Sequence, residues 1–70
     1  MSAYPLYRDA SGAYILRDGD RDLVELRPAE PNWWTGRRLP GGHERRLYGP
    51  HDGTPESEAT AAARVARQLL

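Results

Sequence analysis

The stretch NWWTGRRLPGGHERRLYG, residues 32–49, decides the predicted fold because it joins a strong turn signal to two short strand-like segments. The turn is the Pro-Gly-Gly run at residues 40–42. On either side, residues 32–39 carry Trp33, Trp34 and Thr35 and residues 43–48 carry Tyr48, which are residue types that favour strands. The stretch also contains both tryptophans and four of the ten arginines. It predicts a β-hairpin that concentrates these side chains.

The predicted hairpin separates its two tryptophans. A three-residue loop would pair Arg38 with Glu44 and Trp34 with Tyr48. Because successive side chains of a strand point to opposite faces, Trp33 and Trp34 cannot both enter one core. We expect one indole to pack inward and the other to lie on the outer surface among the arginines. The candidate binding residues are Trp33, Trp34, Arg37, Arg38, Arg45, Arg46 and Tyr48.

A second hairpin precedes this one, with predicted strands at residues 13–17 and 22–27. Asp18-Gly19 lies between them and tolerates the positive φ that tight hairpin turns need. A three-residue loop would pair Tyr14 with Val24 and place the largest apolar set on one face. A two- or four-residue loop would turn one strand over, because a slip of one residue reverses its faces. We favour the three-residue loop.

The remaining chain predicts one further strand and one helix. Residues 4–8 form an aromatic edge strand, since Pro5 lacks an N–H, and the proline-punctuated residues 28–31 form a connector. Thr54, followed by proline and an acid, is typical of a helix start, and the helix should span residues 55–68. Its apolar stripe would comprise Ala59, Ala62, Ala63, Ala66, Leu69 and Leu70, with Val65 beside it.

These elements predict a single α+β domain over residues 1–70. Its antiparallel sheet of three to five strands would be covered on one side by the C-terminal helix. A chain of 70 residues hides only about 60% of the surface that its unfolded form exposes, so we expect marginal stability. Dimerisation would add buried surface and raise the stability, and both a monomer and a homodimer are compatible with the sequence.

Charge and composition limit the partners. The formal net charge is zero, with four arginines against six acids in residues 1–30 and six against four in residues 31–70. Zero net charge argues against non-specific binding to polyanions. The absence of cysteine, of a signal peptide and of a long apolar run predicts a cytoplasmic protein without a membrane span.

The sequence predicts no enzyme, no cofactor and no metal site. Cysteine and lysine nucleophiles are absent. His51-Asp52 beside Thr54 and Ser57 is the one candidate catalytic group, and capping and turn roles explain those residues better. The two histidines lack the spacing of a zinc site.

Residues 6–38 resemble part of a Src-homology-3 domain. The likeness lies in Leu6-Tyr7, in the segments 16–20 and 23–26, and in the tryptophan pair at residues 33–37. The resemblance implies a groove for proline-rich peptides lined by Trp33, Tyr7 and Tyr48.

Residues 46–66 resemble the closing strand, turn and helix of small sheet-plus-helix domains of the integrase arm type. That resemblance implies a sheet face that carries arginine and tryptophan into the DNA major groove.

The residues together favour a non-catalytic protein-interaction module, accessory or regulatory, with the Trp/Arg-rich hairpin as its contact surface. Tryptophan and arginine are enriched at interface hot spots. The small size is compatible with a mobile-element inhibitor of a host complex. The alternative is a nucleic-acid-binding domain that uses the same face, since aromatic rings beside arginines also stack on unpaired bases.

Overall fold

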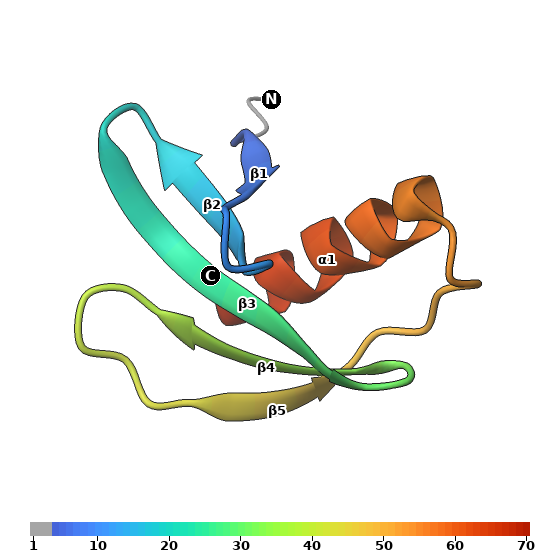
Figure 1. The fold of residues 1–70 in the computed structure, drawn as a ribbon. Helices are drawn as coiled ribbons and strands as arrows, with labels where there is room; N and C mark the ends of the chain where they lie inside the picture. The colour runs from blue at the N-terminus through green and yellow to red at the C-terminus, as the bar shows by residue number, and fades with distance from the viewer. Residues whose placement is uncertain (1–3) are drawn as a thin grey trace.

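Five antiparallel strands follow one another across a single sheet, and one C-terminal helix covers one of its faces (Figure 1). The computed structural model describes residues 4–70. The α+β fold class predicted from the sequence is confirmed. The strand order is β1-β2-β3-β4-β5, so the chain is a simple meander. The elements are β1 (Leu6–Arg8), β2 (Tyr14–Asp18), β3 (Arg21–Glu30), β4 (Trp33–Arg38), β5 (Arg45–Tyr48) and α1 (Pro55–Leu69).

The β2–β3 hairpin has the predicted faces and a different register. Tyr14 pairs with Leu26 and Leu16 with Val24, so the predicted pairing of Tyr14 with Val24 is wrong. At the tip, Asp18 and Arg21 pair and close a two-residue turn. Next to this turn the register shifts between Leu16 and Arg17, which marks a β-bulge. The extra residue of the bulge compensates for the shorter turn. The apolar side chains of both strands therefore still share one face.

β3 is longer than expected, because it runs through most of the predicted connector. Pro28 lies within it, opposite Trp34 and beyond the start of β2. On that side the described residues place no strand beside Pro28, so the missing N–H of proline breaks no ladder bond. The strand ends in a tight turn at Pro31 and Asn32, where Asn32 has a φ of 69°. Proline followed by a residue of positive φ is typical of a type II turn.

The β4–β5 hairpin is offset by one residue from the prediction. Tyr48 pairs with Trp33 rather than with Trp34, and Trp34 pairs with Leu47. The loop is longer than three residues, since β4 ends at Arg38 and β5 begins at Arg45. The predicted pairing of Arg38 with Glu44 is therefore not part of the ladder.

The core lies between the sheet and α1. Trp34, Leu26 and Val24 from the sheet meet Val65 from the helix, and all four are fully buried. Small alanines on α1 let it lie close to the strands. The buried helix residues are Ala61, Ala62, Val65, Ala66 and Leu69. The predicted stripe was wrong at its ends, since Ala59 and Leu70 are exposed and Ala61 takes their place.

The start of α1 is fixed as the sequence predicted. Thr54 is the N-cap, and its hydroxyl accepts a hydrogen bond from the backbone N–H of Ser57. Pro55 opens the helix, which extends one residue beyond the predicted end. Within residues 4–70, no helix has the length and apolar character that crossing a bilayer requires.

Candidate functional site

The two adjacent tryptophans lie on opposite faces of the sheet, as strand alternation predicted. Trp34 is fully buried under α1, and its indole N–H donates a 2.9 Å hydrogen bond to the carbonyl oxygen of Gly49. Tyr14 packs edge-on against it, with ring centroids 5.7 Å apart. Trp34 is therefore a structural residue. Trp33 remains as the candidate for the surface role.

Trp33 lies on the outer face of the sheet in contact with an arginine and a tyrosine. The guanidinium of Arg46 stacks 4.8 Å from the Trp33 ring centroid. Tyr48 packs edge-on at 5.2 Å and remains 54% exposed. We call Trp33, Arg46 and Tyr48 the aromatic–arginine patch. Because its neighbours cover part of the indole, Trp33 is half-buried, less open than the exposed anchor that the sequence predicted.

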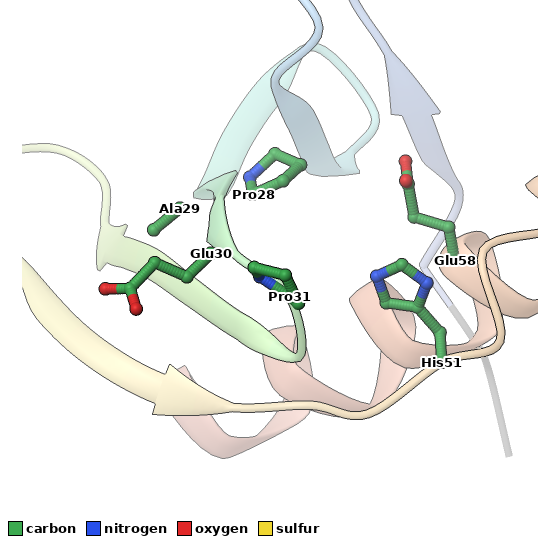
Figure 2. Close-up of a pocket in the computed structure, with 6 residues that line it drawn as sticks. All are labelled: Pro28, Ala29, Glu30, Pro31, His51 and Glu58. Atoms are coloured by element: carbon green, nitrogen blue, oxygen red, sulfur yellow. The ribbon is translucent and has the colours of Figure 1, made fainter.

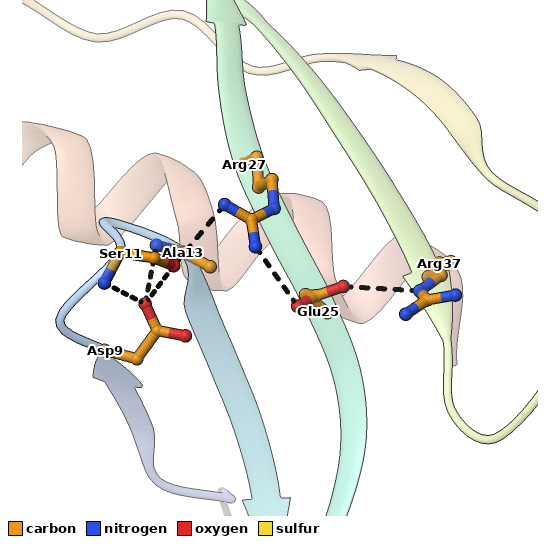
Figure 3. Close-up of polar contacts among 6 residues, drawn as sticks. All are labelled: Asp9, Ser11, Ala13, Glu25, Arg27 and Arg37. Atoms are coloured by element: carbon orange, nitrogen blue, oxygen red, sulfur yellow. Dashed lines mark hydrogen bonds and ion pairs between the residues drawn. The ribbon is translucent and has the colours of Figure 1, made fainter.

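Ion pairs hold most of the charged side chains on the outer face. Glu25 accepts from Arg37 at 3.3 Å and lies 3.7 Å from Arg27, so one carboxylate bridges two strands (Figure 3). Arg46 pairs with Glu30 at 2.6 Å while it stacks on Trp33. Exposed pairs of this kind stabilise by about 0–1 kcal/mol each. Their larger effect is to fix where the guanidinium groups point.

The four arginines of the hairpin do not form one cluster. Arg46 lies opposite Thr35 on the outer face, whereas Arg45 lies opposite Gly36, whose side of the sheet faces α1. Arg37 and Arg38 likewise alternate along β4. The sequence expectation that one outer tryptophan sits among all four arginines is thus corrected: Arg37 and Arg46 share the outer face with Trp33, and Arg46 is the one that stacks on its ring. Arg38 and Arg45 lie at the end of the hairpin, and no acid of residues 4–70 lies within ion-pair distance of either.

The structure also separates the three groove residues that the Src-homology-3 resemblance implies. Trp33 and Tyr48 lie together on β4 and β5. Tyr7 is on β1, at the other edge of the sheet, with its ring 4.7 Å from the guanidinium of Arg17. β2 and β3 lie between them, so the three aromatic rings do not line one groove.

A shallow pocket beside the start of α1 was not predicted from the sequence. Its volume is about 300 Å³, and Figure 2 shows proline rings facing His51 and Glu58 across it. The Glu58 carboxylate accepts a hydrogen bond from the Tyr14 hydroxyl. Burial, and then this hydrogen bond, raise the pKa of Tyr14 above its ordinary value. The lining residues are Pro28, Ala29, Glu30, Pro31, His51 and Glu58.

The polar groups near this pocket serve the backbone. His51 Nδ1 accepts from the N–H of Gly53 at 3.2 Å, and Asp52 accepts from both the N–H and the hydroxyl of Thr54. These bonds with Thr54 lower the pKa of Asp52. Ser57 accepts from the N–H of Asp52. The hydroxyls are thus occupied in helix capping. Residues 4–70 contain no group of three or more side chains placed to hold a metal ion.

No protein-family model, curated protein or solved structure matches the chain. The two partial resemblances seen in the sequence therefore stay predictions. What the structure defines is a class of architecture: a five-stranded antiparallel meander with one helix on its inner face and the aromatic–arginine patch on its outer face.

Proposed function

We propose that the protein is a small, non-catalytic interaction module that binds a protein partner through the aromatic–arginine patch. The supporting observation is that Arg46 stacks on Trp33 next to an exposed Tyr48, on the face of the sheet that α1 leaves uncovered. Tryptophan, tyrosine and arginine are the residues most enriched at interface hot spots. Here Trp33 contacts both Arg46 and Tyr48, and strand pairing holds all three in place.

Preorganisation of Arg46 also supports the proposal that the patch binds a protein partner. Ordering a flexible side chain on binding costs about 0.5–1.5 kcal/mol. Arg46 is already held between Trp33 and Glu30, so less of this cost remains at the moment of association. A patch of this kind suits an accessory or regulatory protein that docks on a larger partner.

The nucleic-acid alternative has weaker support. Binding to a phosphate backbone requires cationic groups that are free to neutralise phosphates. On the outer face, Arg37 and Arg46 each already pair with a glutamate, and the chain has no net charge. Protein binding is the function that this geometry favours.

Affinity capture from extracts of the source cells, followed by a binding assay with the recovered partner, tests the proposal. Trp33→Ala should weaken binding of that partner by about 30-fold, since hot-spot residues contribute about 2 kcal/mol or more. Tyr7→Ala is the matched control, because it removes an exposed aromatic ring from the opposite edge of the same sheet. Equal loss in both variants, no loss in either, or capture of nucleic acid instead of protein would refute the proposal.

A further inference from the structure

β5 is the last strand of the sheet that residues 4–70 form, and one side of its backbone faces none of the other four strands (Figure 1). The N–H of Gly49 donates to the carbonyl of Asn32 at 2.8 Å, which marks this pair as hydrogen-bonded. In an antiparallel ladder such pairs alternate, so Leu47 and Arg45 also bond to β4. The N–H and C=O groups of Arg46 and Tyr48 therefore point away from the sheet.

We infer that the partner contributes an extended acidic segment that adds to β5 as a sixth, antiparallel strand. The inference rests on the proposed function and names the partner's chemistry at the same site. Arg46 and Tyr48 together offer two donors and two acceptors to such a strand. Both residues also belong to the aromatic–arginine patch, so backbone pairing and side-chain contact would occur at one place.

The charge at this edge selects an acidic occupant. Arg45 and Arg46 lie on β5, and Arg38 lies at the neighbouring end of β4. Arg46 is already paired with Glu30, so the charges left to attract an acid are those of Arg38 and Arg45, neither of which has an acid of residues 4–70 within ion-pair distance. Opposite charges on adjacent strands stabilise pairing, and like charges oppose it. A second copy of the chain would bring another set of arginines to the same edge.

Side-chain alternation defines the pattern of the segment. Arg46 and Tyr48 project from the outer face, while Arg45 and Leu47 project from the inner one. An antiparallel strand would meet Tyr48, Leu47, Arg46 and Arg45 in that order from its own N-terminus. We therefore expect two apolar residues followed by two acids.

Fluorescence anisotropy with a labelled eight-residue peptide, centred on Val-Ile-Glu-Glu, tests the inference on the full chain. Saturable binding is expected, and the peptide with both glutamates replaced by lysine should bind at least tenfold more weakly. N-methylation of the first glutamate, opposite Arg46, should weaken binding at least tenfold, because its N–H faces β5. N-methylation of the second glutamate, whose N–H faces away, should change affinity less than threefold.

Two variants at one position provide the matching test on the protein. Arg46→Ala removes the charge, and Arg46→Pro also removes the outward N–H without taking a bond from β4. The proline variant should bind the peptide at least tenfold more weakly than the alanine variant while both keep the wild-type circular dichroism spectrum. If the proline variant does not fold, the two methylated peptides show whether the peptide backbone pairs with β5.

Absence of peptide binding, equal effects of the two methylations, equal binding of the lysine peptide, or a stable dimer that occupies β5 would each overturn the inference. Failure here is distinguishable from failure of the proposed function. If partner binding depends on Trp33 but the peptides do not bind, the partner docks on the face and not along the edge. If neither result appears, both proposals are wrong.

Discussion

The indole N–H of Trp34 donates a 2.9 Å hydrogen bond to the carbonyl oxygen of Gly49 in the interior of the domain. This bond ties the beginning of β4 to the chain that leaves β5. Because successive side chains of β4 alternate between the two faces of the sheet, burial of Trp34 under α1 leaves Trp33 on the opposite face. The buried member of the pair determines where the surface member lies.

Replacement of each tryptophan by phenylalanine should separate these two roles. Trp34→Phe leaves the buried carbonyl of Gly49 without its donor, which costs about 1–3 kcal/mol before any loss of packing. Trp33→Phe should lower the free energy of unfolding by less than about 1 kcal/mol, the size of an exposed cation–π contact. Urea unfolding of both variants measures this. Equal destabilisation would contradict the assignment of Trp34 as core and Trp33 as surface.

Gly49 allows the close approach of the hairpin to the helix, and a side chain there should destabilise the fold. A Cβ at this position would lie 2.5 Å from Val65 Cγ2 and 2.8 Å from Trp34 Nε1. Gly49→Ala should therefore cost about 1–3 kcal/mol through overpacking. In a double-mutant cycle with Val65→Ala, the pair should cost about 1 kcal/mol less than the sum of the single changes. Strict additivity would show that these residues do not compete for space.

The same substitution at two threonines should have different effects on stability. Thr54→Ala removes the N-cap acceptor and should destabilise by about 1 kcal/mol. Thr60 lies inside α1, where its hydroxyl bonds back to the carbonyl of Glu56, a contact that favours helices little or not at all. Thr60→Ala should be neutral or stabilising, because alanine is the better helix former. Thermal unfolding followed by circular dichroism distinguishes the two, and a cost at Thr60 as large as that at Thr54 would be inconsistent with the capping role.

Tyr14 should make stability depend on alkaline pH. Burial and the hydrogen bond to Glu58 raise the pKa of Tyr14, so the folded chain holds this proton more tightly than the unfolded chain, where tyrosine titrates near 10.0. Its contribution is thus fully present below that pH and is lost as pH rises through the folded pKa. Urea midpoints from about pH 8 to about pH 11 should fall more steeply for the wild-type protein than for Tyr14→Phe. Parallel curves would exclude a contribution from Tyr14.

Much of the fold was predictable because its signals are local. Turn residues bound each strand, period-two alternation separates Trp33 from Trp34, and Thr54-Pro55 starts the helix in a way that side-chain chemistry alone explains. Fold class, element order and the inner apolar residues of β2 and β3 follow from such signals.

The pairing registers of the two hairpins were not predictable, because they depend on backbone irregularities. The bulge after Leu16 changes the pairing of the first hairpin while preserving its faces. In the second hairpin the longer loop offsets β5 by one residue, which pairs Tyr48 with Trp33 and places Arg46 on the same face as Trp33. The aromatic–arginine patch is a product of that offset.

The pocket at His51 and the contact of Tyr14 with Glu58 depend on tertiary packing. Tyr14 and Glu58 lie 44 positions apart in the chain, on β2 and α1, and the pocket is lined by residues from two separate segments and α1. No periodicity or spacing in the sequence links them. The unpaired backbone N–H and C=O groups of β5 could not be predicted from the sequence either, because the position of a strand in a sheet must be known before its edge can be identified.

The central claim is that Trp33, and not Trp34, meets the partner, and ¹⁹F NMR tests it most directly. With 5-fluorotryptophan incorporated, the two tryptophans give two resonances, which Trp33→Phe assigns. On addition of the captured partner, the Trp33 resonance should shift or broaden while the Trp34 resonance stays in place under α1. An unchanged Trp33 resonance at saturation with the partner would contradict the account.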